Sequence, residues 1–244
     1  MTAVLVHGVP VTSAVWQRLG RCLAGTDVVP VRLPGFGGEL PPGFEPTMDG
    51  YAAWLATSIS HLDEVDLVGQ DWGGLLVLRV ASAAPSNVRS WVVDSPDLDA
   101  GFAWHPGAIR WQTPGQGEQL ARWIGGSPLD RRVELLATAG VPLDVAVSLA
   151  PAIDDAMTTA MLGLYRSATD IGTAWGPDLD RITAPGVCVV AGRDPFREPE
   201  RVRRLADRLA ARLLELPGAG HFWMLDEPEA VGRALTGFWG SLGR

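Results

Sequence analysis

The sequence predicts an α/β protein in which a mostly parallel sheet is flanked by helices. Two observations lead to this prediction: short apolar runs recur along the chain, and helical patterns separate most of them. Uninterrupted apolar runs are typical of strands buried on both faces, as the strands of a parallel sheet are. The expected strands are 3–7, 28–33, 65–70, 90–94, 186–192 and 213–217, and the expected helices lie near 12–24, 48–62, 72–84, 198–212 and 227–241.

The regular alternation stops between Pro96 and Pro185. This stretch is rich in Trp, Gly and Pro and continues into Ala-rich helical patterns. We therefore expect residues 97–176 to form an inserted helical cap, and residues 1–96 and 177–244 to form the core that carries the sheet.

The helix expected at 198–212 has an apolar face opposite a face of arginines. Its apolar residues recur every three or four positions: Val202, Leu205, Leu209 and Leu213. We interpret the arginines as a solvated face and not as a nucleic-acid patch. The chain has 20 Lys plus Arg against 28 Asp plus Glu, a formal charge of -8, which argues against nucleic acid or an anionic membrane as a partner.

The composition is that of a globular protein with one sizeable core, since 47% of the 244 residues are hydrophobic. The expected ligands are a small neutral organic substrate and water, and the expected assembly is a monomer or a homodimer. The start, "MTAVLVHGVP", has neither a basic segment nor a membrane-length apolar run, so a cytoplasmic protein is expected. Cys22 and Cys188 lie in apolar runs and are expected to be buried thiols.

The segment "VGQDWGG" (68–74) predicts a sharp turn between a strand and a helix. Gly69 and Gly73 allow the chain to turn tightly, so that Asp71 between them is held exposed at the carboxyl end of the strand. In enzymes with this turn, the exposed residue is the nucleophile. The alternative is that Asp71 only caps the helix that starts at Trp72, because Asp is favoured at helix N-caps.

Two further residues follow expected strands in the order that a catalytic triad requires. Asp194 ends the run "VCVVAGRD", and His221 lies in the loop "PGAGHFW" before the last helix. Nucleophile, acid and histidine occur in this order in one large class of hydrolases. We therefore hypothesise that Asp71 is the nucleophile, His221 the base and Asp194 the partner of the base. The other histidines are expected to be structural (His7), solvated (His61) and part of the cap (His105).

These motifs make the sequence similar to the α/β-hydrolase superfamily, and within it to the Asp-nucleophile branch of epoxide hydrolases and haloalkane dehalogenases. "VHGVP" resembles the His-Gly-x-Pro motif of that branch, "LPGFGG" the loop after the next strand, and "GQDWGG" the turn that carries the nucleophile. The resemblance spans nearly the whole chain. It implies an oxyanion hole formed by the N–H groups of Val9 and Trp72, a cis Val9–Pro10 bond, and no cofactor or metal. Because the chain starts directly on "AVLVH", the sheet is expected to lack the usual opening hairpin and to have about six strands.

The chemistry explains why an aspartate suits this turn. A carboxylate that attacks an sp³ carbon forms an alkyl ester, which water must then hydrolyse at the ester carbonyl. His221, oriented by Asp194, would take the proton of that water while the oxyanion hole stabilises the charge on Asp71. Asp94, at the end of its strand, stands where some dehalogenases carry the acid, and it is the alternate partner of His221.

The two activities of the branch, epoxide hydrolysis and haloalkane dehalogenation, differ in the leaving group that the site must stabilise. The epoxide hydrolases that the sequence resembles donate to the epoxide oxygen from two cap tyrosines. Tyr165 has the Tyr-Arg context of the second tyrosine, and His105 or a cap tryptophan could replace the first. The dehalogenases hold the halide with the Trp after the nucleophile, here Trp72, and with a cap Trp or an Asn, but Val9 occupies the Asn position. The candidate cap tryptophans are Trp104, Trp111, Trp123 and Trp175.

An epoxide hydrolase acting on a small neutral epoxide is therefore the favoured hypothesis, with a haloalkane dehalogenase as the main alternative. An ester or lactone hydrolase and a non-catalytic ligand receptor on the same fold stay open, although a receptor would not need Asp71, Asp194 and His221 together. A charged substrate is not expected, because no paired arginines lie between Trp72 and Leu78, where a fluoroacetate-type site would have them.

Overall fold

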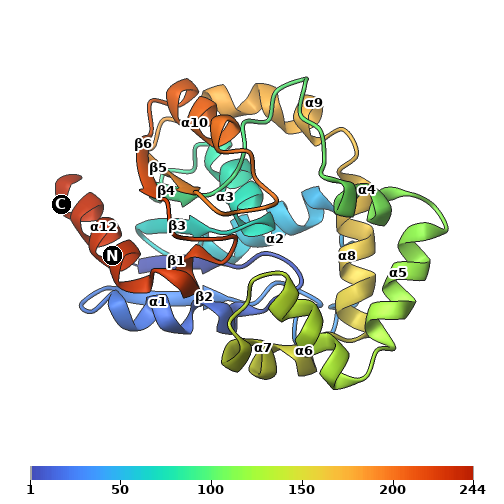
Figure 1. Ribbon diagram of the computed structural model, residues 1–244. Helices are drawn as coiled ribbons and strands as arrows, with labels where there is room; N and C mark the ends of the chain where they lie inside the picture. Colours follow the sequence, from blue (N-terminus) through green and yellow to red (C-terminus); the bar gives the residue numbers. More distant parts are fainter. Residues whose placement is uncertain (1, 244) are drawn as a thin grey trace.

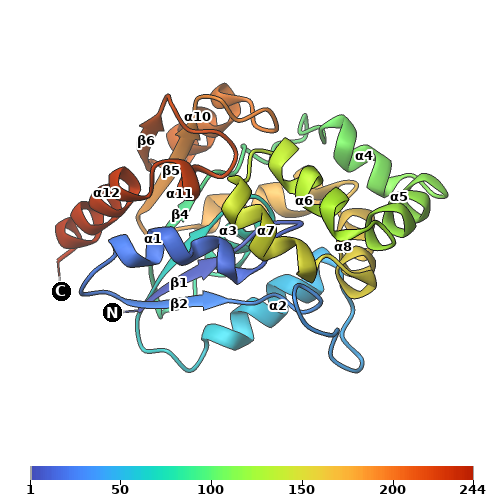
Figure 2. The same ribbon diagram turned by 60° about the horizontal axis from the view of Figure 1, so that its bottom comes forward.

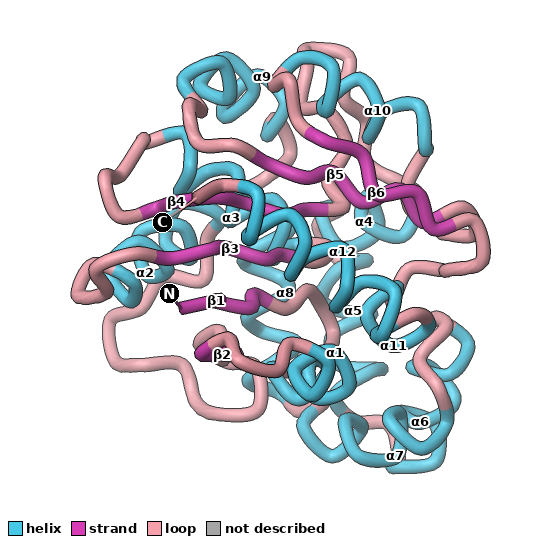
Figure 3. The backbone as a smooth tube through the Cα atoms, turned by 90° about the vertical axis from the view of Figure 1, so that its left-hand side faces the viewer, coloured by secondary structure: helices cyan, strands magenta, loops and turns pink. Residues whose placement is uncertain are grey.

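The computed structural model describes residues 2–243, and these contain one six-stranded sheet in the order β2-β1-β3-β4-β5-β6 (Figures 1 and 3). All five strand pairings are parallel. The α/β fold with about six strands is therefore confirmed. The strands are β1 Thr2–Val6, β2 Asp27–Val31, β3 Val65–Gly69, β4 Val88–Val93, β5 Gly186–Ala191 and β6 Arg212–Leu216.

Burial along the strands follows their place in the sheet. Every residue of β3 and of β5 is buried, which explains why β5 is an uninterrupted apolar run. The one charged residue of β3, Asp66, is paired with Arg89. The edge strands β2 and β6 are mostly exposed or half-buried. Pro30 lies in β2, where the missing N–H of a proline can face away from the neighbouring strand.

Helices cover both faces of this sheet. On one side α1 (Gln17–Cys22) packs on α12 (Pro228–Ser241), as Figure 2 shows. Elsewhere α2 (Met48–Ile59) packs on α3 (Trp72–Ser82), and α3 packs directly on β3 and β4. The helix α3 is buried on almost all sides, so its position relative to the strands is fixed by packing. Two short elements complete the layer of α1 and α12: η1 Ser13–Trp16 and α11 Trp223–Asp226.

The helix expected at 198–212 is shorter than predicted, because α10 spans only Pro199–Arg208. Val202 and Leu205 are buried in it as expected. The chain then leaves the helix through Ala210, which has a positive φ of 49°, and enters β6. Leu213 therefore belongs to a strand and is 43% exposed, so its agreement with the helical spacing was coincidental.

The segment between β4 and β5 is helical, and most of it lies beyond the carboxyl ends of the strands (Figure 1). The last helix of the segment, α9, packs instead on the core layer: the indole N–H of Trp175 donates to Asp49 in α2, and Arg79 of α3 lies over the Trp175 ring. The helices are α4 Pro106–Gln112, α5 Gln116–Gly125, α6 Leu129–Thr138, α7 Leu143–Leu149, α8 Asp155–Ser167 and α9 Ile171–Trp175, with the short turns η2 Ala150–Ala152 and η3 Gly176–Arg181.

Two smaller expectations can be compared with the structure. Cys188 is buried as expected, but Cys22 is only half-buried, and neither forms a disulfide.

No single helix in the described range has the length and hydropathy of a membrane span. One helix pair, Leu143–Ala152 with Asp155–Ser167, meets both criteria when joined, across a bend of 91°.

Candidate active site

Asp71 lies at the turn between β3 and α3 in a strained backbone conformation, with φ 55° and ψ -122°. Positive φ is rare for residues other than glycine and is found where the surrounding structure imposes it. The flanking glycines are required sterically: a Cβ at Gly73 would collide with the carbonyl oxygen of Val6, and one at Gly69 with the carbonyl oxygen of Gly73. The side chain of Asp71 makes no capping hydrogen bond to α3, so it does not act as an ordinary helix cap.

The Asp71 carboxylate has different partners at its two oxygens. Oδ1 accepts a hydrogen bond from the backbone N–H of Val9 at 3.1 Å. Oδ2 lies 2.8 Å from the guanidinium of Arg197 and 3.7 Å from Nε2 of His221. Burial opposes ionisation, but the charges of Arg197 and His221 and the backbone N–H groups of Trp72 and Val9 outweigh it, so the pKa of Asp71 is lowered. The carboxylate is therefore ionised at neutral pH, and Oδ1 already accepts from a backbone N–H donor.

The loop after β1 brings Val9 to this position. His7 is fully buried, its Nδ1 bonds with the carbonyl oxygen of Gly8, and its Nε2 accepts from the N–H of Leu33. Burial lowers the pKa of His7 to about 4, so it is neutral and structural, as expected. The Val9–Pro10 bond is cis, as the resemblance implies.

His221 lies between Asp71 and Asp194. Its Nδ1 is 2.9 Å from Oδ2 of Asp194. The side-chain amide of Gln70 donates both to the backbone carbonyl of His221 and to Nε2, at 3.2 and 3.0 Å. This arrangement assigns the proton to Nδ1, and the lone pair of Nε2, the nitrogen that faces Asp71, accepts from Gln70. Burial opposes charging of the imidazole, but the hydrogen bond and charge of Asp194 prevail, and the pKa of His221 is raised.

Asp94 does not bond with His221, although its carboxylate lies in the same cluster. Its oxygens accept instead from the backbone N–H of Asp71 and from the indole N–H of Trp223, each at 2.9 Å. Asp94 therefore holds the turn that carries Asp71, and the imidazole of His221 forms its hydrogen bond with Asp194. Burial raises the pKa of Asp94 to about 6, against the opposing charges of Arg197 and His221.

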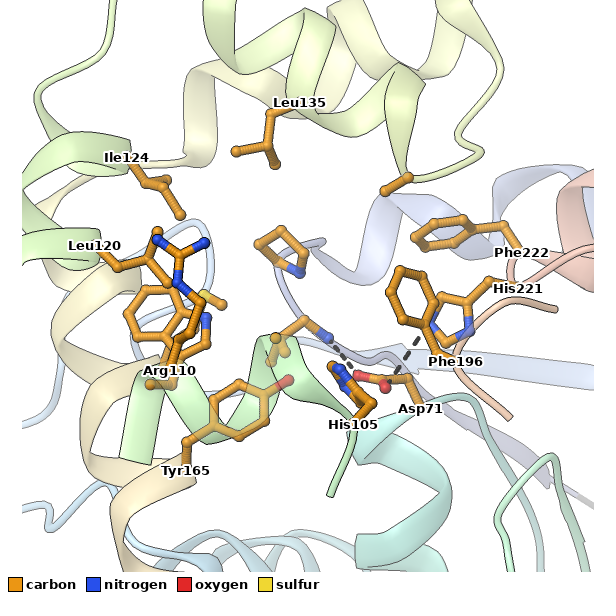
Figure 4. A pocket seen from close by; sticks show the side chains of 16 residues that line it. Asp71, His105, Arg110, Leu120, Ile124, Leu135, Tyr165, Phe196, His221 and Phe222 are labelled. Atoms are coloured by element: carbon orange, nitrogen blue, oxygen red, sulfur yellow. Dashed lines mark hydrogen bonds and ion pairs between the residues drawn. The ribbon is translucent and has the colours of Figure 1, made fainter. Parts of the chain in front are cut away.

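A pocket of about 190 Å³ opens above Asp71 and His221 (Figure 4). Most of the other lining residues come from the inserted segment, where α4, α5, α6 and α8 each contribute side chains. Most of these side chains are apolar. The lining residues include Leu120, Ile124, Leu135, Met161, Phe196 and Phe222.

Three side chains of the inserted segment that line this pocket carry polar or charged head groups: Tyr165, His105 and Arg110. The hydroxyl of Tyr165 is directed toward Asp71 (Figure 4). Burial and then the charge of Asp71 raise the pKa of Tyr165, so the hydroxyl keeps its proton. Nδ1 of His105 accepts from the N–H of Ala108 at 3.3 Å, and burial lowers the pKa of His105. A neutral imidazole that accepts at Nδ1 carries its proton on Nε2, so His105 is also a donor.

The candidate tryptophans differ in whether the indole N–H is free to bind a leaving group. Trp104 donates to the carbonyl oxygen of Ala168 at 2.7 Å and does not line the pocket, so the expectation that it could hold a leaving group is wrong. Trp111 lines the pocket, with its ring stacked on that of Tyr165. Nε1 of Trp72 is buried without a hydrogen-bond partner of good geometry, and the indole lowers the pKa of Tyr165. Neither remaining candidate faces the site: Trp123 is 60% exposed, and Trp175 bonds to Asp49.

Sequence reasoning missed two arginines at this site. Arg197 is buried against Asp71, with 7% of its side chain exposed, and its Nε has no hydrogen-bond partner. Arg110 lines the pocket on α4. The signal for Arg197 was its place three residues after Asp194. Nothing in the sequence separates it from the exposed arginines of the helix that follows.

Fold and site together define an α/β hydrolase, in which a strained turn presents an acid to a histidine beneath a helical segment. The chain belongs to the alpha/beta hydrolase family, whose model matches residues 3–234.

Several solved structures share this fold at low sequence identity. A haloalkane dehalogenase from Bradyrhizobium elkani is 23% identical, with a TM-score of 0.75 over 99% of this chain and 90% of that one. A protein of Pseudomonas aeruginosa with a provisional epoxide hydrolase assignment is 23% identical, with a TM-score of 0.80 over 99% and 89%. A thermophilic esterase from Thermogutta terrifontis is 21% identical, with a TM-score of 0.77 over 100% and 91%. At these identities the likeness shows a shared fold.

Proposed function

We propose that the protein hydrolyses an epoxide through a covalent ester on Asp71. The observation that carries this proposal is that Tyr165 and His105, two donors that are neutral at pH 7, line the same pocket as Asp71 and His221. Opening an epoxide places negative charge on oxygen, and preorganised donors stabilise such charge most when water is excluded. No cofactor enters this reaction.

In the first step, Oδ2 of Asp71 attacks an epoxide carbon and breaks its bond to oxygen. The other oxygen, Oδ1, accepts from the Val9 N–H, where negative charge must be stabilised in the second step, so we assign the attack to Oδ2. Arg197 occupies one lone pair of Oδ2 and leaves the second available. The epoxide oxygen takes a proton from Tyr165 with support from Nε2–H of His105, so the products of this step are a hydroxy ester and a tyrosinate.

In the second step, Nε2 of His221 exchanges its hydrogen bond with Gln70 for one with water and takes a proton from that water. The resulting hydroxide attacks the Asp71 carbonyl carbon. Charge then develops on Oδ1, where the Val9 N–H already donates. Collapse of this intermediate breaks the bond to Oδ2, which leaves with the product as its new hydroxyl and takes the proton from His221. Arg197 lies on this same oxygen and stabilises its departure. The net proton released by ester hydrolysis returns to Tyr165.

A second candidate, haloalkane dehalogenation, is favoured by one observation: the buried N–H of Trp72 has no partner of good geometry. A halide would need such a donor. Against this candidate, Trp72 does not line the pocket, and Trp104 already uses its N–H.

The test is turnover of three substrates by one preparation: a styrene-type epoxide, a bromoalkane of similar size, and a nitrophenyl ester. The proposal predicts turnover of the epoxide, and loss of that turnover in Asp71→Asn. Turnover of the bromoalkane alone would favour the second candidate. Turnover of the ester alone, with Asp71→Asn active, would contradict an aspartyl ester mechanism.

A further inference from the structure

The charges around the pocket are arranged unequally at its two ends. At the Asp71 end, the carboxylate is offset by Arg197 at 2.8 Å, with both side chains less than one-tenth exposed. Asp194 lies behind His221, with 1% of its side chain exposed. An incoming anion therefore meets an ion pair at this end and not a bare carboxylate, which removes most of the repulsion that an unpaired Asp71 would exert.

At the opposite end lies Arg110, whose guanidinium faces the cavity beside Leu120 and Ile124 (Figure 4). Among residues 2–243, no acid or carbonyl group pairs with this guanidinium. An arginine on an exposed helix is free to extend into water, yet this one lies along an apolar pocket wall. The methylene groups of Arg110 can pack on such a wall. The guanidinium is then the polar group at this end of the pocket.

We propose, on the basis of the epoxide hydrolase function above, that the substrate carries a carboxylate at the end remote from its epoxide ring, and that Arg110 binds this carboxylate. The planar guanidinium matches a carboxylate through two parallel hydrogen bonds. The apolar side chains that line the pocket, among them Met161 and Leu135, suit the carbon chain that joins the epoxide to the carboxylate. This departs from the neutral substrate that composition predicts, because a local unpaired charge outweighs the overall charge of -8 at short range.

The test compares ω-epoxyalkanoates of increasing chain length with the corresponding primary amides, which have nearly the same shape but no charge. The wild-type protein is expected to have a kcat/KM about tenfold or more higher for the acid than for the amide at the best chain length, as a charge-assisted bond implies. Arg110→Gln should remove this preference through a rise in KM for the acid that is much larger than any change in KM for the amide. Arg110→Lys should restore part of it.

Arg122 supplies a matched control, because it is an exposed arginine on the neighbouring helix α5 that does not line the pocket. Arg122→Gln should preserve the preference. Added salt should lower kcat/KM for the acid alone, since Arg110 is an exposed residue whose charge salt can screen.

Equal kcat/KM for acid and amide in the wild type would overturn the inference and leave the epoxide hydrolase function intact. An equal loss of kcat/KM for the acid and the amide in Arg110→Gln would likewise overturn the inference and leave the epoxide hydrolase function intact. If neither acid nor amide is turned over and no ester forms on Asp71, the proposed function fails and this inference fails with it.

Discussion

The guanidinium of Arg197 lies 2.8 Å from Oδ2 of Asp71, the oxygen of the carboxylate that is not held by Val9. A buried ion pair is costly to break from one side, because the partner is left as an uncompensated charge. In this site the pair also decides the ionisation of the proposed nucleophile, since the charge of Arg197 is the largest influence that lowers the pKa of Asp71.

Arg197→Met should therefore raise the pKa of Asp71 and make the formation of the ester sensitive to acid. Attack needs the ionised carboxylate, so the rate of ester formation in the variant should fall as pH decreases through the raised pKa, while the wild-type rate stays level over that range. Single-turnover measurements across pH test this directly. The variant should also lose about 3–5 kcal/mol of unfolding free energy.

Arg204→Met is a suitable control, because Arg204 is 53% exposed on α10. It should change neither the pH profile nor the stability beyond about 0.5 kcal/mol. Arg197→Lys keeps the charge and should keep the wild-type pH profile even if its rate is lower. A profile that is the same for Arg197→Met and the wild type would show that the ion pair does not control Asp71.

Tyr165→Phe should slow ester formation from an epoxide by at least about tenfold, because it removes a donor to the developing oxygen charge. His105→Phe should have an effect in the same direction. Neither change should slow hydrolysis of an ester that has already formed, since that step uses His221. Rapid mixing followed by mass analysis separates the two steps.

Tyr51→Phe is the matched control for the loss of a hydroxyl. Tyr51 is buried and donates to the carbonyl oxygen of Pro34, outside the pocket. We expect it to cost about 1 kcal/mol of stability and to leave the rate of ester formation unchanged. An unchanged rate in Tyr165→Phe would move the leaving-group role to Trp72 and favour a halide.

Asp194 and Asp94 should respond differently to the same substitution. Asp194→Asn should lower the pKa of His221, because Asp194 supplies the hydrogen bond and charge that raise it above 6.5. It should also slow ester hydrolysis by about 100-fold or more, since the imidazole loses the acceptor that fixes its tautomer. Titration of the His221 imidazole by NMR, together with single-turnover rates, provides both measurements.

Asp94→Asn should instead act on the turn. An Asn at this position can accept from only one of its two present donors, Asp71 N–H and Trp223 Nε1–H, and must point an amide N–H at the other. The expected result is a clear loss of stability with the pKa of His221 still raised. If Asp94→Asn lowered that pKa and Asp194→Asn did not, the assignment of the acid to Asp194 would be wrong.

The central elements of the fold could be predicted because burial leaves a local trace. β5 is an uninterrupted apolar run, β3 is apolar except for Asp66, and the glycines around Asp71 are needed where backbone atoms approach closely. The end of α10 could not be predicted, because Leu213 continues a helical spacing by chance while the positive φ at Ala210 ends the helix. Sequence spacing therefore fixed the type of element better than its limits.

The site was predictable only where its residues follow strands. Asp71, Asp194 and His221 each lie just beyond a strand end, and parallel strands bring those ends to one edge of the sheet. Arg197 and Arg110 come to the site through the path of a loop and the packing of α4, which no local pattern encodes. The same limit applies to Trp104, whose N–H is taken by a carbonyl from a distant turn.

The fate of oxygen atoms distinguishes an ester mechanism from direct attack by water. In a single turnover in ¹⁸O-labelled water, the first diol formed should be unlabelled, because its new hydroxyl oxygen is Oδ2 of Asp71. The label should appear in the peptide that contains Asp71. Label in the diol from the first turnover, with an unlabelled peptide, would mean that Asp71 acts as a base toward water.

The central claim is that Asp71 becomes covalently bonded to the substrate, and the most direct measurement is the mass of His221→Gln after incubation with an epoxide. Ester formation needs the carboxylate, and ester hydrolysis needs the imidazole. The account predicts an adduct equal to the whole mass of the epoxide, located on the peptide that contains "VGQDWGG" and absent from the double variant with Asp71→Asn. An adduct lighter by the mass of hydrogen halide, formed only from a haloalkane, would identify a dehalogenase. If His221→Gln stays unmodified by epoxides that the wild type turns over, and Asp71→Asn keeps full activity, the account is contradicted.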